Sequence, residues 1–126
     1  MMITIPGKAI TKKNSQRILY RNGRAFIAPS AAYERYEREA GYHLTPRPRK
    51  PLTGPLEVKC LYYMPTRHRV DLVNLLEATC DVLVRYGIIE DDHCGIVASH
   101  DGSRVLYDKA HPRTEIYISR LEDRNE

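Results

Sequence analysis

The segment DLVNLLEATCDVLVRYG, residues 71–87, constrains the fold more than any other stretch, because both ends of a helix are marked in it. Asp71 is a residue type that caps helix N-termini, and Gly87 can adopt the left-handed conformation that ends a helix. At about 100° per residue, the apolar side chains between them fall on one broad arc, which predicts a helix packed on another layer of structure. The arc consists of Leu72, Leu75, Leu76, Thr79, Val82, Leu83 and Tyr86.

Strands are indicated both before and after this helix. The stretch LEVKCLYYM, residues 56–64, alternates apolar with charged side chains over its first half and is followed by a proline, as a half-buried strand often is. In RILYRNGRAFIA, the pair Asn22-Gly23 tolerates the positive φ angles of a tight turn, so a hairpin is predicted over residues 17–28. Further strands are expected at residues 1–5, 95–100 and 114–121, with a turn at Asp101-Gly102.

A second helix is predicted in SAAYERYEREAGYHL, residues 30–44, where Ser30 can cap the start and Tyr33 and Tyr36 lie on one side. The prolines of TPRPRKPLTGP, residues 45–55, exclude regular structure, so this stretch is a connector. Together these elements predict one α+β domain spanning residues 1–126, a mixed sheet with two main helices packed on it.

The composition is that of a globular chain with a single core. A length of 126 residues suits one domain, and 42% apolar with 29% charged residues argues against disorder. No apolar run can cross a bilayer and MMITIPGKAI lacks the core of a signal peptide, so a cytoplasmic protein without membrane contact is expected. Three cysteines without CxxC spacing indicate reduced thiols. Zinc is disfavoured because the separations of His68, Cys80, His93 and Cys94 are irregular.

Basic residues give the chain a net charge of +4 and gather in three stretches. A solvated surface explains any one of them, but three stretches with an acidic segment beside the last favour a polyanionic partner such as nucleic acid. The stretches contain Lys12, Lys13, Arg17, Arg21 and Arg24, then Arg47, Arg49 and Lys50, then Arg67, His68 and Arg69.

Oxygen-bearing side chains occur at two separate points around the helix of residues 71–87. One set shares the polar face of the helix, and the other follows the helix directly, between two apolar stretches. Either set can be structural, as a cap and a solvated turn, or the two can meet around a metal ion. The residues are Asp71, Asn74, Glu77 and Asp81 on the helix and Glu90, Asp91 and Asp92 beyond it.

The stretch DLVNLLEATCDVLVRYGIIEDD, preceded by MPTRHRV, resembles the core motif of the RusA family of Holliday junction resolvases. These are phage- and prophage-borne endonucleases that cut four-way DNA junctions. Their motif is Asp-Leu-Asp-Asn-Leu, a lysine, a helix, a glycine and a final Asp-Asp pair. The resemblance extends more weakly over ITIPGKAITKKNSQR, RNGRAFIAPSAAYERYE and TEIYISRLE, and thus over nearly the whole chain. It implies a RusA-like fold.

The resemblance also implies which residues carry the chemistry. Asp71 matches the first aspartate of the motif and Asp92 the later catalytic aspartate, with Asp91 beside it. These three aspartates are the expected metal ligands and catalytic residues. The chain departs from the family pattern in having Val73 for the second aspartate and Glu77 for the lysine. Glu77 joins the catalytic set because its carboxylate can replace an acidic oxygen on the same helix face.

Phosphodiester hydrolysis requires stabilisation of charge on the attacking and leaving oxygens, so Mg²⁺ is the expected cofactor, with Mn²⁺ as a substitute. The resemblance implies a four-way DNA junction as the partner. It also implies a homodimer, in keeping with the two symmetry-related scissile phosphates of a junction. Contacts with the DNA backbone are expected from Lys12, Lys13, Asn14, Arg17, Arg67 and Arg69.

Three other functions stay open from the sequence. The departures at Val73 and Glu77 fit a catalytically weakened, branched-DNA-binding protein of the same fold. A nuclease for flaps or replication intermediates would use the same residues on a different substrate. A small structural or regulatory protein would leave the acidic residues 90–92 as an inert, solvated turn.

Overall fold

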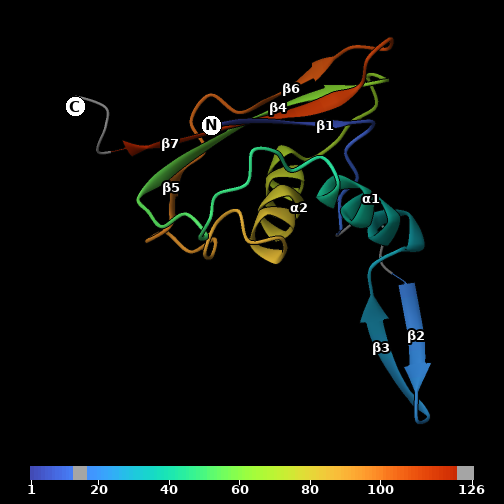
Figure 1. Cartoon of the computed structure of the whole chain (residues 1–126). Coiled ribbons are helices and arrows are strands. Elements are labelled where there is room, and N and C mark those ends of the chain that lie inside the picture. The colour runs from blue at the N-terminus through green and yellow to red at the C-terminus, as the bar shows by residue number, and fades with distance from the viewer. Residues whose placement is uncertain (13–16, 122–126) are drawn as a thin grey trace.

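A five-stranded sheet carries both main helices on one of its faces (Figure 1). The structure is a computed structural model and describes residues 1–12 and 17–121. Helices α1 (Ala31–Gly41) and α2 (Leu72–Arg85) lie on the same side of the sheet. The mixed sheet with two helices on it confirms the predicted α+β, RusA-like fold.

The strand order places the longest strand inside the sheet. Strand β1 (Met2–Pro6) pairs with β7 (Arg113–Arg120), and β7 pairs with β4 (Leu56–Met64), both antiparallel. The other edge of β4 pairs in parallel with two short strands, first β5 (Val97–Ser99) and then β6 (Arg104–Tyr107). The strands expected at the start, middle and end of the chain are confirmed, whereas β6 was not predicted.

Side chains fill the gap between the two short edge strands. The backbone N–H of Cys60, which lies between the parts of β4 that pair with β5 and β6, donates to Ser103 Oγ over 3.0 Å. His100 Nδ1 lies 2.7 Å from the carbonyl oxygen of Val58. The turn predicted at residues 101–102 is present, with a φ of 83° at Gly102. Backbone groups of β4 thus keep hydrogen-bond partners where the edge strand is interrupted.

Both helices start at the predicted caps. Ser30 Oγ accepts a hydrogen bond from the Tyr33 N–H over 3.0 Å at the start of α1. A Cβ added at Gly41, in the last turn of α1, would lie 2.6 Å from the ring of Tyr86, the C-cap residue of α2, so a larger residue there would have to displace this ring. Gly87, which follows the C-cap residue Tyr86, has a φ of 74°, as its predicted role in ending the helix requires. No helix in the described ranges is long and apolar enough to span a membrane.

The core lies between the sheet and the helices. The inward side chains of β4 alternate along the strand and are buried, which confirms the predicted pattern. The Tyr62 hydroxyl lies 2.7 Å from Thr79 Oγ1 inside this core, which explains a threonine on the apolar arc of α2. The other core side chains include Ile3, Ile5, Leu75, Val82, Leu83, Ile88, Ile89, Ile116 and Ile118.

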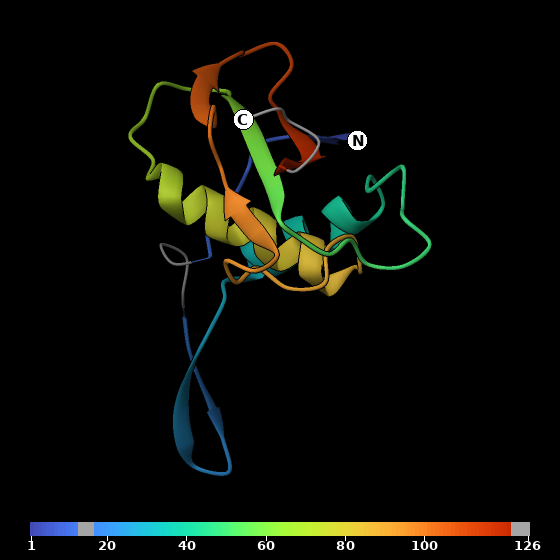
Figure 2. The same cartoon turned by 90° about the vertical axis from the view of Figure 1, so that its left-hand side faces the viewer.

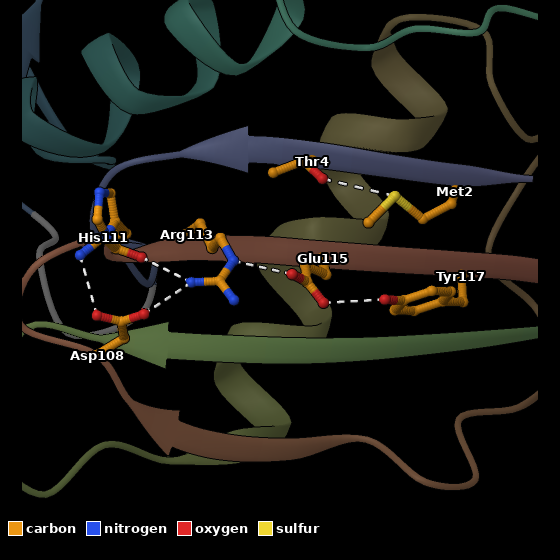
Figure 3. Close-up of polar contacts among 7 residues, drawn as sticks. All are labelled: Met2, Thr4, Asp108, His111, Arg113, Glu115 and Tyr117. Atoms are coloured by element: carbon orange, nitrogen blue, oxygen red, sulfur yellow. Dashed lines mark hydrogen bonds and ion pairs between the residues drawn. The ribbon is translucent and has the colours of Figure 1, made fainter.

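The face of the sheet away from the helices is lined by polar and aromatic side chains (Figure 3). Arg113 donates from Nε to Glu115 over 2.8 Å and from Nη1 to Asp108 over 2.9 Å. The guanidinium carbon of Arg113 lies 3.8 Å from the centroid of the Tyr63 ring. The Tyr117 hydroxyl donates to Glu115 over 2.9 Å. The antiparallel part of the sheet, strands β1, β7 and β4, thus has one packed and one solvated face.

A two-stranded arm projects from the rest of the protein in both views (Figure 1, Figure 2). It consists of β2 (Arg17–Arg21) and β3 (Arg24–Ala28), which pair antiparallel. Asn22 and Gly23 have φ angles of 53° and 76°, so the hairpin turn predicted from Asn-Gly is confirmed.

Candidate active site

A row of polar side chains follows α2 from its N-cap toward its C-terminal end. Asp71 caps the helix, where its Oδ1 accepts a hydrogen bond from the backbone N–H of Val73 over 3.0 Å. Asn74, Glu77 and Asp81 follow on the same face. At a rise of ~1.5 Å per residue, Asp71 and Asp81 are about 15 Å apart along the helix axis. The row therefore has two separate ends.

Asp81 has an electrostatic environment that is unusual for an aspartate on a polar helix face. Partial burial is the largest cause that raises the pKa of its carboxyl above the ordinary value, and the ammonium of Lys12 opposes this shift. The charges of Asp92 and Glu77 raise the pKa of Asp81 further. Asp92 also contributes to the raised pKa of the Cys80 thiol, about 12, for which burial is the main cause. Two other carboxylates, those of Glu77 and Asp92, therefore contribute to the electrostatic environment of Asp81.

The acidic residues 91–92 lie on an exposed segment that is held on both sides. Before them, Leu52 exchanges two backbone hydrogen bonds of 2.9 Å with residues 88 and 90. After them, the N–H groups of residues 96 and 97 both donate to the carbonyl oxygen of His93 over 2.9 Å. Within the segment, the Asp91 carboxylate accepts a hydrogen bond from the Asp92 N–H over 2.8 Å. The fold therefore fixes the path of the backbone around both aspartates.

The predicted metal ligands come from the start of α2 and from the segment that follows this helix. Asp92 and Glu77 each raise the pKa of Asp81, whereas Asp71 caps the helix at its N-terminus. Residues 1–12 and 17–121 contain no group of three or more His, Cys, Asp or Glu side chains placed to hold a metal ion within one copy. Joint metal binding by Asp71, Asp91 and Asp92 stays a prediction, as does the catalytic role of Glu77.

Two of the predicted DNA contacts lie near the hairpin base. Lys12 Nζ is 3.5 Å from Asp81 Oδ2, and the two side chains are 44% and 32% exposed. Arg17 donates from Nε to the carbonyl oxygen of Pro29 over 3.0 Å and pairs with Glu34 over 3.4 Å. Lys12 therefore lies at the Asp81 end of the polar row. The predicted contacts Lys13 and Asn14 lie outside the described residues.

The other two predicted DNA contacts lie near the start of α2. Arg67 is exposed, with its guanidinium carbon 4.2 Å from the centroid of the Tyr107 ring. Arg69 is also exposed and lines a pocket of about 190 Å³ together with Lys8 and His68. Cationic side chains thus border the polar row at the Asp71 end as well.

Asp81 is the residue that sequence reasoning left out of the candidate site. Its spacing of four residues from Glu77 placed it on the polar face, which is the one signal that the sequence offers. The approach of Lys12 and the charge of Asp92 single it out. Lys12 lies far away in the sequence, and the effect of Asp92 depends on how the segment after α2 folds back.

A family model described as Endodeoxyribonuclease RusA matches residues 6–119 of this chain. A search of curated proteins finds no match. The matched range includes both helices, the polar row on α2 and the acidic segment after it. The RusA family implies Holliday junction resolvase activity, binding of branched DNA and, in general, dependence on a divalent metal ion. Because the match spans most of the 126 residues, this chain belongs to the RusA endodeoxyribonuclease family.

Proposed function

We propose that this protein is a Mg²⁺-dependent endonuclease that hydrolyses phosphodiester bonds at four-way DNA junctions. The observation that carries the proposal is that the charges of two other carboxylates, those of Asp92 and Glu77, both raise the pKa of Asp81 on the polar row of α2. Carboxylates that repel one another on a protein surface are stabilised by a cation held between them. Membership of the RusA family supports the same reaction class.

In this proposal, Asp71, Asp91 and Asp92 are the metal ligands, and Glu77 and Asp81 supply further carboxylate oxygens. The donor set fits Mg²⁺, which takes oxygen ligands and keeps several waters. When bound, Mg²⁺ supplies the positive charge that hydrolysis needs at the attacking and leaving oxygens of the phosphate. The backbone hydrogen bonds on both sides of residues 91–92 support this assignment, because they limit the movement of two of the ligands.

In this proposal, the basic residues position the DNA. Lys12 lies at the Asp81 end of the polar row, and Arg67 and Arg69 lie near its Asp71 end. In the proposed complex they contact backbone phosphates on either side of the scissile bond and set the register without reading the sequence. A Kd for DNA that rises steeply with salt concentration is expected.

The proposal includes a twofold homodimer. A four-way junction offers two symmetry-related phosphates for cleavage, and a dimer with twofold symmetry presents one site to each. Within one copy, the described residues hold no group of three or more side chains placed to bind a metal ion, so a second copy near the site is also a way to complete a set of ligands.

The experiment that tests the proposal compares a synthetic four-way junction with a linear duplex of the same sequence. We expect the junction to be cut in the presence of Mg²⁺ or Mn²⁺, to stay intact in a chelator, and to be cut in preference to the duplex. Flap and fork substrates belong in the same gel, because preferential cleavage of either would indicate a different branched substrate. Absence of metal-dependent cleavage of every branched substrate would contradict the proposal.

A second candidate function is binding of branched DNA with weakened catalysis. Val73 is 68% exposed although it is an aliphatic residue, so packing does not explain a valine in place of the aspartate of the family motif. Glu77 places negative charge where the family motif has a lysine. A protein that binds the junction tightly but cuts it slowly, at any Mg²⁺ concentration, would match this second function.

A further inference from the structure

The projecting arm, residues 17–28, has two faces that differ in chemistry. Residues directly opposite each other in an antiparallel pair point to the same side. The register pairs Ile18 with Ile27 and Tyr20 with Ala25, which places these four on one face. The other face carries three further pairs, Arg17 with Ala28, Leu19 with Phe26, and Arg21 with Arg24.

The face that carries Ile18, Tyr20, Ala25 and Ile27, called the apolar face below, is open to solvent. Ile18 is 65% exposed, Ile27 is 68% exposed and Tyr20 is 74% exposed. An isolated two-stranded hairpin is marginally stable in water, and a contiguous exposed apolar patch indicates a surface that a partner covers. The apolar face therefore requires an occupant.

The charge of the arm indicates what that occupant is. Residues 17–28 include three arginines and no acidic residue. Arg21 and Arg24 lie directly opposite each other beside the turn, and neither has a carboxylate partner among the described residues. Like charges in directly opposed positions repel, and a polyanion relieves that repulsion. The tip of the arm is thus suited to a phosphate backbone.

We infer that the arm is a junction-binding element, with its arginines on backbone phosphates and its apolar face against bases at the branch point. A two-stranded ribbon fits into the major groove of DNA. The centre of an opened four-way junction exposes base faces that a linear duplex does not, and Tyr20, flanked by Ile18 and Ile27, offers a ring on which such a base stacks. The inference rests on the proposed function and adds the means by which a branched substrate is distinguished from a linear one.

Position in the fold is consistent with this role. Arg17 ties the base of the arm to the body through Pro29 and Glu34. The same base lies close in sequence to Lys12, which pairs with Asp81 in the polar row. The arm therefore extends from the same side of the sheet as the candidate active site, the side that carries α1 and α2 (Figure 1).

Three variants of the full chain test the inference. An apolar-face variant combines Ile18→Thr, Tyr20→Thr and Ile27→Thr, since threonine keeps strand propensity on an exposed hairpin. A tip variant combines Arg21→Gln and Arg24→Gln. A matched control combines Arg104→Gln and Lys109→Gln, two exposed cations away from the arm, and removes the same charge as the tip variant. For each variant, we measure the Kd for the four-way junction and for a linear duplex. We also measure the change that the variant causes in the fluorescence of 2-aminopurine placed at the branch point of the junction. Sedimentation gives the mass of each variant.

We expect the apolar-face variant to lose about tenfold or more in junction affinity, to keep its duplex affinity and mass, and to lose the fluorescence change at the branch point. The tip variant should lose affinity for both DNAs, and this loss should exceed that of the control. The slope of log Kd against log salt concentration should fall by the equivalent of up to about two phosphate contacts. Junction affinity equal to wild type in both arm variants would overturn the inference. A fall in mass of the apolar-face variant would also overturn it, because a second copy of the chain would then be the occupant.

The same data separate this inference from the proposed function. If the wild-type protein binds and cuts the junction while both arm variants do so equally well, the arm inference fails and the proposed nuclease stands. If the wild-type protein binds the junction through the arm but never cuts it, the nuclease fails and the arm inference stands.

Discussion

Asp71 Oδ1 accepts a hydrogen bond from the backbone N–H of Val73 over 3.0 Å, so a residue proposed to bind metal also caps the helix that carries the polar row. The two roles can be separated, because asparagine caps helices about as well as aspartate but is a much weaker ligand for Mg²⁺. A loss of cleavage in an aspartate variant therefore has to be examined together with its stability.

Asp71→Asn should keep the free energy of unfolding and lose metal-dependent cleavage of a four-way junction. Asp71→Ala should lose cleavage and, in addition, about 1 kcal/mol of stability, because the N–H groups of the first helical turn lose their acceptor. Urea unfolding and single-turnover cleavage of both variants check this. If Asp71→Asn cuts like the wild type, the residue is only a cap.

Val73→Asp should raise the cleavage rate if the exposed valine marks a lost carboxylate. Val73 is 68% exposed in the first turn of α2, so the substitution removes no packing. We expect a gain of about tenfold or more in cleavage with Mg²⁺, with little change in junction affinity. Val73→Asn, which has a similar shape without the charge, is the control. An equal rate in wild type and Val73→Asp would mean that this position takes no part in catalysis.

The polar network on the outer face of the sheet should make stability depend on pH in the acid range (Figure 3). The pKa of Asp108 is lowered first by the hydrogen bond from the His111 N–H and then by Arg113, and the pKa of Glu115 is lowered mainly by Arg113. A carboxyl with a lowered folded pKa stabilises the fold above its unfolded pKa of about 4, and this contribution is lost as the pH falls through the folded value.

Arg113→Gln should therefore flatten the fall of stability between about pH 5 and pH 2, since Asp108 and Glu115 would titrate closer to their unfolded values. Urea unfolding at a series of pH values, with Lys109→Gln as a control for net charge, measures this slope. A slope unchanged from wild type in Arg113→Gln would rule out the network as the source of acid sensitivity.

The three thiols should differ sharply in reactivity. Burial raises the pKa of Cys60 and of Cys80 to about 12, whereas Cys94 is exposed. One thiol per chain should react rapidly with an aromatic disulfide reagent in the native protein, and all three should react in denaturant. Cys94→Ser should abolish the rapid reaction, and a remaining rapid reaction in that variant would contradict the burial of the other two.

Much of the fold could be predicted from local signals. The ends of α2, the Asn-Gly turn of the arm and the alternation along β4 are fixed by residues that are neighbours in the sequence. Strand β6 was missed because RVLY is short and becomes a strand through parallel pairing with β4, a contact across some forty residues. Propensity alone does not encode such a pairing.

The site was predicted less completely than the fold. The sequence identifies Asp71, Asp91 and Asp92 as motif residues and gives the face that Glu77 shares with Asp81. It does not give the influence of Asp92 on Asp81, because that depends on how the segment after α2 folds back and pairs with Leu52. Asp81, whose pKa these charges raise, therefore lies one helical turn beyond Glu77, the last helix residue that the motif identifies.

The measurement that tests the central claim most directly is single-turnover cleavage of a four-way junction by Asp92→Asn in Mg²⁺, with junction affinity measured alongside. Asparagine keeps the size of the side chain and removes the charge that acts on Asp81. Loss of about a hundredfold or more in rate, with an unchanged Kd for the junction, is the predicted result. Cleavage at the wild-type rate would contradict the claim that this carboxylate serves a metal ion.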